Sequence, residues 1–296
     1  MFDKVVIVGV GLIGGSFALG LKAARAATII VGLERSSEAL ARARELGIID
    51  EACLDPRAAL QGADLVLLAT PVAQTEAVLR QLAPWLEPHT IVTDAGSTKS
   101  DVVASARAAL GERVKQFVPG HPIAGRESNG PDAALPDLFR GKKTVLAPLP
   151  ENPPAMVERV AAAWTLCGAI IHRLSPEEHD RVFAAVSHLP HLLAFALVDD
   201  IAGKPHADLL FQYAASGFRD FTRIAGSSPE MWRDISLANR EAILGELDAY
   251  LAQLVNIRAR LADADGPALE TVYGNAQRAR RAWIEAIEAA EGKRND

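Results

Sequence analysis

Cysteine is scarce in this chain. Cys53 and Cys167 are widely separated along the 296 residues, and neither belongs to a Cys-x-x-Cys spacing or lies beside a pair of histidines. This pattern argues against a disulfide framework and indicates no metal site. We interpret both cysteines as small core residues of a protein in a reducing compartment, and we predict that no metal ion takes part in its function.

Long basic runs and long apolar runs are also missing. The formal net charge is −6 and no extended Lys/Arg run occurs, which argues against binding to nucleic acid or to a membrane surface. The chain has no stretch of about 18 uninterrupted apolar residues, so we expect no membrane span. An apolar strand pattern begins by residue 4 and leaves no room for a signal peptide, so we expect a cytoplasmic location.

A glycine-rich turn follows the first strand pattern. The apolar residues 4–8 lead into Gly9, Gly11 and Gly14, with Leu12 and Ile13 between the last two, and a helical pattern continues to about residue 25. In this setting the first glycine permits the tight turn, the second lets the backbone approach a pyrophosphate, and the third lets helix and strand pack closely. The helix N-terminus adds partial positive charge. The motif predicts a dinucleotide site.

An acidic residue ends the second strand pattern. Residues 28–33 are followed by Glu34, which lies 20 residues beyond Gly14. An acid at this place accepts hydrogen bonds from the ribose hydroxyls and repels a 2′-phosphate, so NAD is favoured over NADP. Arg35 and the two serines after it could accommodate a 2′-phosphate if Glu34 turned aside. NADP therefore remains possible.

The order of the remaining patterns predicts the fold class. Strand patterns at 64–70, 90–94, 115–119, 144–147 and 169–173 alternate with Ala-rich helical patterns, which is typical of a doubly wound, mostly parallel Rossmann-type sheet. After residues 175–178, a helix start, the patterns are helical. We predict a dinucleotide-binding domain at 1–174 and a helical domain at 175–296. Thr70 and Asp94, at the carboxyl ends of two strands, are assigned to the cofactor site.

Two further polar positions follow strand ends. Ser97 is placed to reach a nicotinamide or a substrate, or else it caps a helix over 98–110; both interpretations stay open. Pro122 keeps His121 extended on a stiff loop, where its imidazole could accept the proton of an alcohol as a hydride leaves. A structural histidine bonded to backbone is the alternative. If His121 is the base, kcat/KM should rise with pH through a pKa near about 6.5.

The helical part carries its own polar cluster. Pro190 interrupts a helical pattern between His188 and His191, and we expect one of these histidines to face a cleft, with a core or capping role favoured for His188. Arg219 and Arg223 lie four residues apart, so on a helix they share a face and could bind a carboxylate or phosphate. A solvated face whose arginines pair with nearby aspartates is the alternative. Trp232 is expected to be core or interface packing.

Five ordered motifs together resemble the prephenate dehydrogenase family, which includes arogenate and cyclohexadienyl dehydrogenases. They cover residues 9–16, 94–99, 121–127, 187–191 and 218–239, and the resemblance runs nearly end to end. It implies NAD(P)-dependent oxidative decarboxylation of prephenate to 4-hydroxyphenylpyruvate, a step toward tyrosine. It also implies a small-molecule substrate, either prephenate or arogenate, and a homodimer formed by the helical domain.

The resemblance also implies residue roles. His121 would accept the hydrogen bond of the ring hydroxyl, and Ser97 would help to orient that hydroxyl and the nicotinamide. Arg223 would bind a substrate carboxylate, and His191 would contact the substrate. The remaining implied roles are an ionic group that controls access, formed by Glu127, Arg219 and Asp220, and a tryptophan at the dimer interface near the site, Trp232.

Other functions stay open on the sequence alone. Arogenate carries an ammonium where prephenate has a ketone, and no acidic residue can be assigned to that ammonium. A non-catalytic dinucleotide sensor would bind NADH tightly without turnover, but it would leave the cluster around His121 unexplained. Another β-hydroxyacid-type dehydrogenase is disfavoured because those enzymes lack the block at 218–239.

Overall fold

The computed structural model describes residues 1–126 and 128–292, and it forms two compact units, 1–243 and 244–296. The predicted domain boundary near residue 174 falls inside the first unit. Helices that follow residue 174 pack against the preceding sheet domain, for example α7 (Pro176–Phe183) against α5 (Ser100–Leu110), so contacts do not separate the chain there. The division at 174 remains a prediction about sequence domains.

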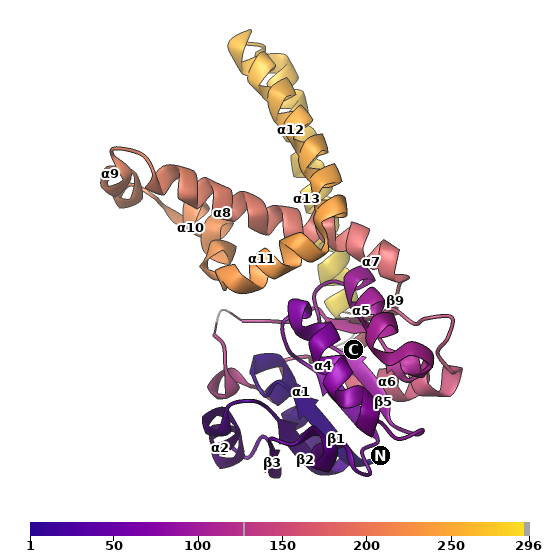
Figure 1. Cartoon of the computed structure of the whole chain (residues 1–296). Helices are drawn as coiled ribbons and strands as arrows, with labels where there is room; N and C mark the ends of the chain where they lie inside the picture. Colours follow the sequence, from indigo (N-terminus) through magenta and orange to yellow (C-terminus); the bar gives the residue numbers. More distant parts are fainter. Residues whose placement is uncertain (127, 293–296) are drawn as a thin grey trace. The chain divides into compact units, whose positions relative to one another are not determined.

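A six-stranded sheet forms the centre of the first unit (Figure 1). All neighbouring strands are parallel, and their order is β3-β2-β1-β4-β5-β6. The strands are β1 (Phe2–Val8), β2 (Ala27–Leu33), β3 (Glu51–Cys53), β4 (Leu65–Leu68), β5 (Ile91–Asp94) and β6 (Phe117–Val118). This order is that of a doubly wound dinucleotide-binding fold, so the predicted fold class is confirmed.

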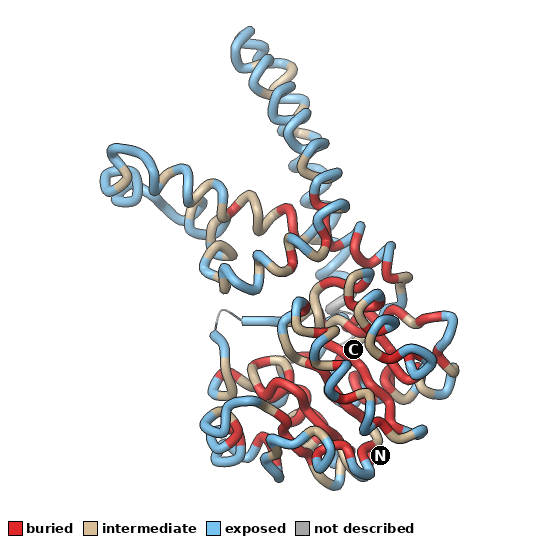
Figure 2. Tube along the Cα trace, viewed as in Figure 1, coloured by how far each residue is buried: buried red, intermediate tan, exposed pale blue. Residues whose placement is uncertain are grey.

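Helices cover both faces of this sheet. The α-helices are α1 (Leu12–Ala23), α2 (Ser37–Glu45), α3 (Pro56–Leu60), α4 (Thr75–Leu82), α5 and α6 (Pro154–Leu166), and short helical turns are η1 (Val72–Gln74), η2 (Ala83–Trp85), η3 (Gly111–Gln116) and η4 (Pro131–Ala133). Alternate residues of β1 enter two separate cores: Val5 and Ile7 pack in one, Val6 and Val8 in the other. Burial on both faces explains the nearly continuous apolar strands (Figure 2).

A second, three-stranded sheet was not predicted. β7 (Gly120–Pro122) pairs antiparallel with β8 (Lys143–Leu146), which pairs parallel with β9 (Ile170–Arg173). The sequence had suggested one sheet with a strand over 115–119. Pro119 has no N–H to continue that ladder, and the chain leaves the large sheet there. His121 therefore lies in a strand, paired with Val145, and the prediction that it lies on a loop was wrong.

The chain from 176 to 202 is one continuous helix that contains an irregular turn. Ser175 and Glu178 form a reciprocal capping box at the start of α7, as the predicted helix start requires. A π-helical turn, η5 (Ala184–His188), then leads into α8 (Leu189–Ala202), where Pro190 occupies the first turn. By length and composition alone this helix could cross a membrane, with a mean hydropathy of 1.6 over an 18-residue window that is 28% buried.

The rest of the first unit is helical. It consists of α9 (Ala207–Gln212), α10 (Ser216–Thr222), η6 (Arg223–Gly226), α11 (Pro229–Ala238) and the start of α12 (Arg240–Ala262). The second unit contains the remainder of α12 and α13 (Gly266–Gly292). Exposed apolar side chains are frequent in α9 and α12, including Leu209, Phe211, Leu251 and Val255. Figure 2 shows most of these two helices as exposed, so the apolar side chains named here are uncovered in the single chain.

Candidate active site

The glycine turn has the geometry that a phosphate needs. Gly9 has φ +92°, and a Cβ there would lie 2.7 Å from the carbonyl oxygen of Ala69. A Cβ on Gly14 would lie 2.2 Å from the carbonyl oxygen of Gly9. Gly11 differs, because a Cβ there would meet no atom within 4 Å. Gly9 and Gly14 thus serve the close packing of the turn, whereas Gly11 borders open space at the N-terminus of α1.

The open space beside Gly11 is a cavity of about 430 Å³, here called the first cavity. It lies at the carboxyl ends of β1, β4 and β5, where doubly wound sheets bind their ligands. Its lining includes Gly11, Leu12, Ile13, Thr70, Gly96, Ser97, His121 and Asp234. The Oγ1 atom of Thr70 is buried and has no hydrogen-bond partner among residues 1–126 and 128–292. An unpaired hydroxyl beside a glycine cradle fits a bound dinucleotide.

We expect Gly11→Ala to weaken NADH binding about tenfold or more, equivalent to about 1.4 kcal/mol. The added methyl group would occupy the space that the pyrophosphate needs, and it would touch no protein atom, so the melting temperature should stay unchanged. Gly217→Ala is the matched control, because Gly217 is also free of neighbours within 4 Å but lines no described cavity. Fluorescence titration with NADH measures the effect; an unchanged dissociation constant for Gly11→Ala would remove the glycine from the cofactor site.

Glu34 and Arg35 lie where the adenosine ribose is expected, beyond the first cavity. Glu34 follows the last residue of β2, is half-buried, and accepts a hydrogen bond from the backbone N–H of Arg35 at 2.9 Å. The guanidinium of Arg35 extends to Gln74 and donates to its Oε1 atom at 2.8 Å. This arrangement leaves Glu34 at the position that favours NAD, as predicted from the spacing.

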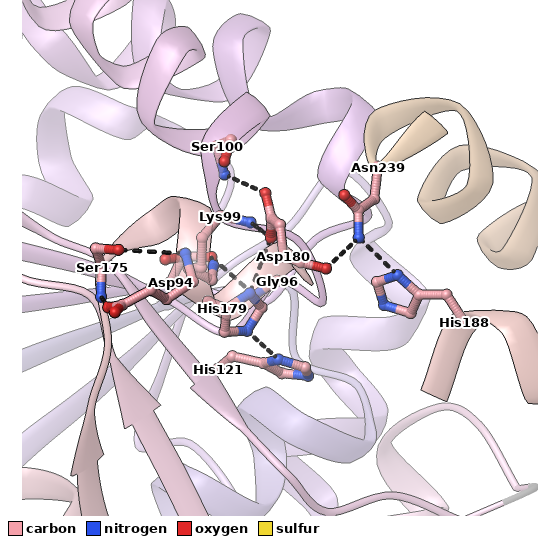
Figure 3. Close-up of polar contacts among 11 residues, drawn as sticks. Asp94, Gly96, Lys99, Ser100, His121, Ser175, His179, Asp180, His188 and Asn239 are labelled. Atoms are coloured by element: carbon pink, nitrogen blue, oxygen red, sulfur yellow. Dashed lines mark hydrogen bonds and ion pairs between the residues drawn. The ribbon is translucent and has the colours of Figure 1, made fainter. Parts of the chain in front are cut away.

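The side chain of Asp94 is structural, which corrects its assignment to the cofactor. It is 3% exposed and lies 2.5 Å from Nζ of Lys99, which is fully buried. Its carboxylate also accepts the backbone N–H groups of Gly96 and Gly120, at 2.8 and 2.9 Å. All of these partners are in the protein, and Figure 3 labels two of them, Gly96 and Lys99, so Asp94 shapes the loop beside the first cavity rather than contacting a ligand with its side chain.

Ser97 lines the first cavity but does not cap a helix. α5 begins at Ser100, and its N-cap residue Lys99 makes no side-chain capping bond. The free N–H groups of Lys99 and Ser100 donate instead to the carboxylate of Asp180 on α7, each at 2.8 Å. The helix is thus capped by a residue 80 positions away, and Ser97 remains available to a ligand.

A second cavity, of about 860 Å³, also borders His121. Among the residues that line it are His121, Phe183, His191, Arg223, Met231 and Trp232. His121 belongs to the lining of both cavities, as do its neighbours Pro122 and Ala124. An imidazole at the junction can contact a molecule in either cavity, which is the position that a base between a cofactor and a substrate requires.

His121 is held by aromatic and imidazole neighbours. Its Nδ1 atom lies 2.8 Å from Nε2 of His179, and the ring of Phe183 packs at a centroid distance of 5.0 Å. Burial lowers the pKa of His121 well below its ordinary value, and Coulombic interactions with His179, Lys99 and His188 lower it further. His121 is therefore neutral near pH 7 and able to accept a proton.

Of the two histidines that flank Pro190, His191 is the one that lines the second cavity. Its Nδ1 atom is 2.8 Å from the backbone oxygen of Ser187, and its ring stacks on Trp232 at a centroid distance of 3.7 Å. Burial lowers the pKa of His191, and the positive charge of Arg223 lowers it further. The hydrogen bond to the backbone of Ser187 acts in the opposite direction. Trp232 thus packs on a site histidine, in addition to any interface role.

His188 has the core role that was favoured for it. It is 2% exposed, and its Nδ1 atom accepts a hydrogen bond from the amide of Asn239 at 3.0 Å. Burial lowers the pKa of His188 to about 4, and a hydrogen bond to the backbone of Ser97 acts in the opposite direction. His188 therefore braces the Ser97 loop against the helical part of the unit.

Of the two arginines, only Arg223 lines a described cavity. α10 ends at Thr222 between them, so Arg223 begins the tighter η6 turn and lines the second cavity, whereas Arg219 is exposed and lines neither cavity. The prediction that both arginines bind one anion is thus supported only for Arg223. Glu127, the third member of the implied ionic group, lies outside the described residues. Across residues 1–126 and 128–292, no group of three or more His, Cys, Asp or Glu side chains could hold a metal ion.

Comparison with known proteins identifies the family. Residues 17–173 match the nucleotide-binding domain of prephenate dehydrogenase, and residues 175–274 match its dimerization domain. The chain belongs to the prephenate dehydrogenase family. The resemblance inferred from the motifs is thus confirmed. The enzyme is an oxidoreductase, and its nucleotide-binding domain holds NAD.

Three relatives show how far the similarity extends. Cyclohexadienyl dehydrogenase of Zymomonas mobilis is 37% identical over 284 residues, which cover 95% of this chain and 96% of that protein. The structure of A. aeolicus prephenate dehydrogenase in complex with hydroxyphenyl propionate and NAD+ has a TM-score of 0.87 at 36% identity, and covers 98% and 99% of the two chains. Synechocystis arogenate dehydrogenase has a TM-score of 0.80 at 31% identity, with 95% and 99% covered.

The sequence reasoning missed several residues of this site. His179 and Asp180 directly follow the acids of a helix start and were not singled out, although adjacent His and Asp are both unusual in a buried helical turn. Lys99, fully buried, was noticed only as part of a motif. Their roles depend on contacts with residues 58 to 81 positions away, as in the bonds His121–His179 and Lys99–Asp180.

Proposed function

We propose that this enzyme oxidises and decarboxylates prephenate to 4-hydroxyphenylpyruvate, with NAD preferred over NADP. The observation that carries the proposal is the place of His121, which borders both the first cavity at the glycine turn and the second cavity with its arginine and histidine. Glu34 at the end of β2 supports NAD. NADP use remains the alternative, since Arg35 lies next to that acid.

The chain's residues perform three tasks in this reaction. Neutral His121 accepts the proton of the ring hydroxyl, and Ser97 in the first cavity orients that hydroxyl. Arg223 binds a carboxylate of the substrate in the second cavity through charge-assisted hydrogen bonds. Bound NAD supplies the hydride acceptor. Loss of carbon dioxide then makes the ring aromatic, so the protein's contribution is orientation and charge matching.

Arogenate is the second candidate, and one contact favours it. The backbone oxygen of Ser187 can only accept, so Nδ1 of His191 carries a hydrogen, and Nε2 of the neutral ring is an acceptor. An acceptor in the second cavity suits the ammonium of arogenate better than the ketone of prephenate. Steady-state kcat/KM for both substrates, each with NAD and NADP, decides between them. If neither substrate is turned over, the non-catalytic dinucleotide sensor becomes the favoured hypothesis.

We expect Arg223→Ala to raise KM for prephenate about ten- to hundredfold, because a hydrogen bond between charged groups contributes about 1.5–3 kcal/mol. The dissociation constant of NADH should stay unchanged, since Arg223 does not line the first cavity. Arg219→Ala is the comparison variant and should change KM less than about threefold. Equal losses in both variants would show that the two arginines act together after all.

We further propose that the enzyme is a cytoplasmic homodimer that binds neither nucleic acid nor membrane. The family description of residues 175–274 as a dimerization domain supports this, as do the exposed apolar side chains of α9 and α12. A second copy would also cover the apolar helix at 176–202. Light scattering after size exclusion tests the stoichiometry; a monomer that partitions into lipid vesicles would contradict the proposal.

A further inference from the structure

Three polar residues form a line that ends at the junction of the two cavities. Nδ1 of His121 lies 2.8 Å from Nε2 of His179, and Nδ1 of His179 lies 2.9 Å from Oδ1 of Asp180 (Figure 3). His179 is fully buried and Asp180 is 5% exposed. The ring of Phe183 packs against both imidazoles, at centroid distances of 5.0 and 4.4 Å. The His179–Asp180 part of the line is therefore shielded from water, so protein groups set the directions of its hydrogen bonds.

Asp180 determines which atom donates and which accepts in each hydrogen bond of this line. Its carboxylate accepts the backbone N–H groups of Lys99 and Ser100, which cannot reverse their role as donors. Burial would raise the pKa of this carboxyl, but the hydrogen bonds from His179 and from these N–H groups outweigh burial and hold its pKa below the ordinary value. Asp180 is thus an ionised acceptor, and Nδ1 of His179 must carry the hydrogen of their shared bond.

Each later bond follows from this one. Burial lowers the pKa of His179, so its ring is neutral and its Nε2 atom has no hydrogen. The bond at Nε2 therefore requires a hydrogen on Nδ1 of His121. Since His121 is neutral too, its own Nε2 atom carries no hydrogen and has a free lone pair; we call it bare.

We propose that His179 and Asp180 are positioning residues that lock His121 in the tautomer with hydrogen on Nδ1, so that its bare Nε2 atom serves as the proton acceptor. The inference rests on the proposed function and names what makes His121 competent for it. After Nε2 takes the hydroxyl proton, the Nδ1–H bond to His179 remains, and the carboxylate of Asp180 lies one ring away from the new positive charge.

The other charged and titratable groups around this line do not compete for that role. Lys99 and Asp94 neutralise each other at 2.5 Å. His188 bonds to Asn239, whose amide also donates to the backbone oxygen of Asp180 at 2.8 Å and so fixes the helix that carries the acid. Asp101 interacts with Asp180 only by Coulombic repulsion. Burial, together with that repulsion, raises the pKa of Asp101.

Asp180→Asn tests the tautomer directly. The Asn oxygen can still accept a helix N–H, while its NH₂ group can donate to Nδ1 of His179, which would reverse both imidazoles and place a hydrogen on Nε2 of His121. We expect kcat to fall about a hundredfold or more, as when the corresponding acid of a serine protease triad becomes Asn. The NADH dissociation constant should not change. Glu177→Gln is the matched control, because it removes the same charge from an exposed position of the same helix.

Nitrogen-15 NMR of histidine-labelled, substrate-free enzyme provides the readout that a packing role would not move. In the wild type we expect hydrogen on Nδ1 and none on Nε2 of His121, and the reverse in Asp180→Asn. The opposite tautomer in the wild type would overturn the proposal. Because this measurement needs no substrate, it stands even if neither prephenate nor arogenate is turned over, and it separates failure of this inference from failure of the proposed function.

A pair of variants at His179 covers the case in which Asp180→Asn does not fold. In His179→Gln the amide oxygen can accept from Nδ1 of His121 and the NH₂ group can donate to Asp180, so we expect the wild-type tautomer and partial activity. His179→Leu cannot do either, and its kcat should be at least about tenfold lower than that of His179→Gln. Equal activity in the two variants would show that His179 contributes packing alone, and the inference would be wrong.

Discussion

His121→Asn is expected to lower kcat by about 10²- to 10⁴-fold, the range that a positioned general base contributes. Asn is close in size and retains polar atoms, but it cannot take a proton from the substrate hydroxyl at neutral pH. The NADH dissociation constant and the melting temperature should change little. Stopped-flow measurement of NADH formation checks the result, and retention of more than about a tenth of wild-type kcat would remove His121 from the mechanism.

The same residue determines the pH dependence of the wild type. The base acts when neutral, so activity is present above its pKa and is lost as pH falls through it. An unperturbed histidine would place this loss near pH 6.5, as expected from the sequence. Burial and the neighbouring His179, Lys99 and His188 hold the pKa of His121 well below that value. We therefore expect kcat/KM to stay level through pH 6.5 and to fall only in more acid solution, and His121→Asn to lack this limb.

Lys99→Met is expected to lower the free energy of unfolding by about 3–5 kcal/mol, because it leaves a buried carboxylate without its cation. Asp94 would still accept hydrogen bonds from the N–H groups of Gly96 and Gly120. These groups do not carry a full charge, so they cannot replace the lysine. Urea unfolding followed by circular dichroism measures the change. A loss below about 1 kcal/mol would show that the ion pair matters little to stability.

The double variant Asp94→Asn with Lys99→Met is the control for this explanation. It removes both charges, so no uncompensated charge stays buried, and it should be more stable than Lys99→Met alone. If the double variant is instead the less stable of the two, the cost lies in lost packing around residue 99 rather than in electrostatics. The comparison therefore separates the two causes.

Local signals predicted the glycine turn, the acid after β2 and the extended backbone at His121. The glycine spacing after a strand requires close backbone approaches, and an added Cβ would lie only 2.7 Å from a carbonyl oxygen at Gly9 and 2.2 Å at Gly14. Glu34 lies at the end of β2 because strand length and turn length fix that distance along the chain. Pro122 correctly indicated an extended backbone at His121. These features depend on neighbours in sequence, where residue type alone restricts the conformation.

Contacts between distant segments explain the errors. For Ser97 the sequence left open a cap or a site role, and Asp180 from α7 takes the place of the cap. Asp94 was expected at the cofactor, but Lys99 folds back on it. Arg219 and Arg223 were expected to bind one anion together, but only Arg223, at the start of η6, lines a described cavity. In each case the choice depends on which partner is within hydrogen-bonding distance after folding, which a pattern of residue types does not contain.

From its amino acids alone, this chain is committed to a parallel nucleotide fold with a helical partner, since apolar periodicity and glycine sterics act over short stretches of backbone. The chemistry of His121 belongs to the folded molecule. Its neutral state, its tautomer and its place between two cavities arise when β7 and α7 bring it against His179 and Asp180, because burial and hydrogen bonding at a shared point set a pKa and a hydrogen position.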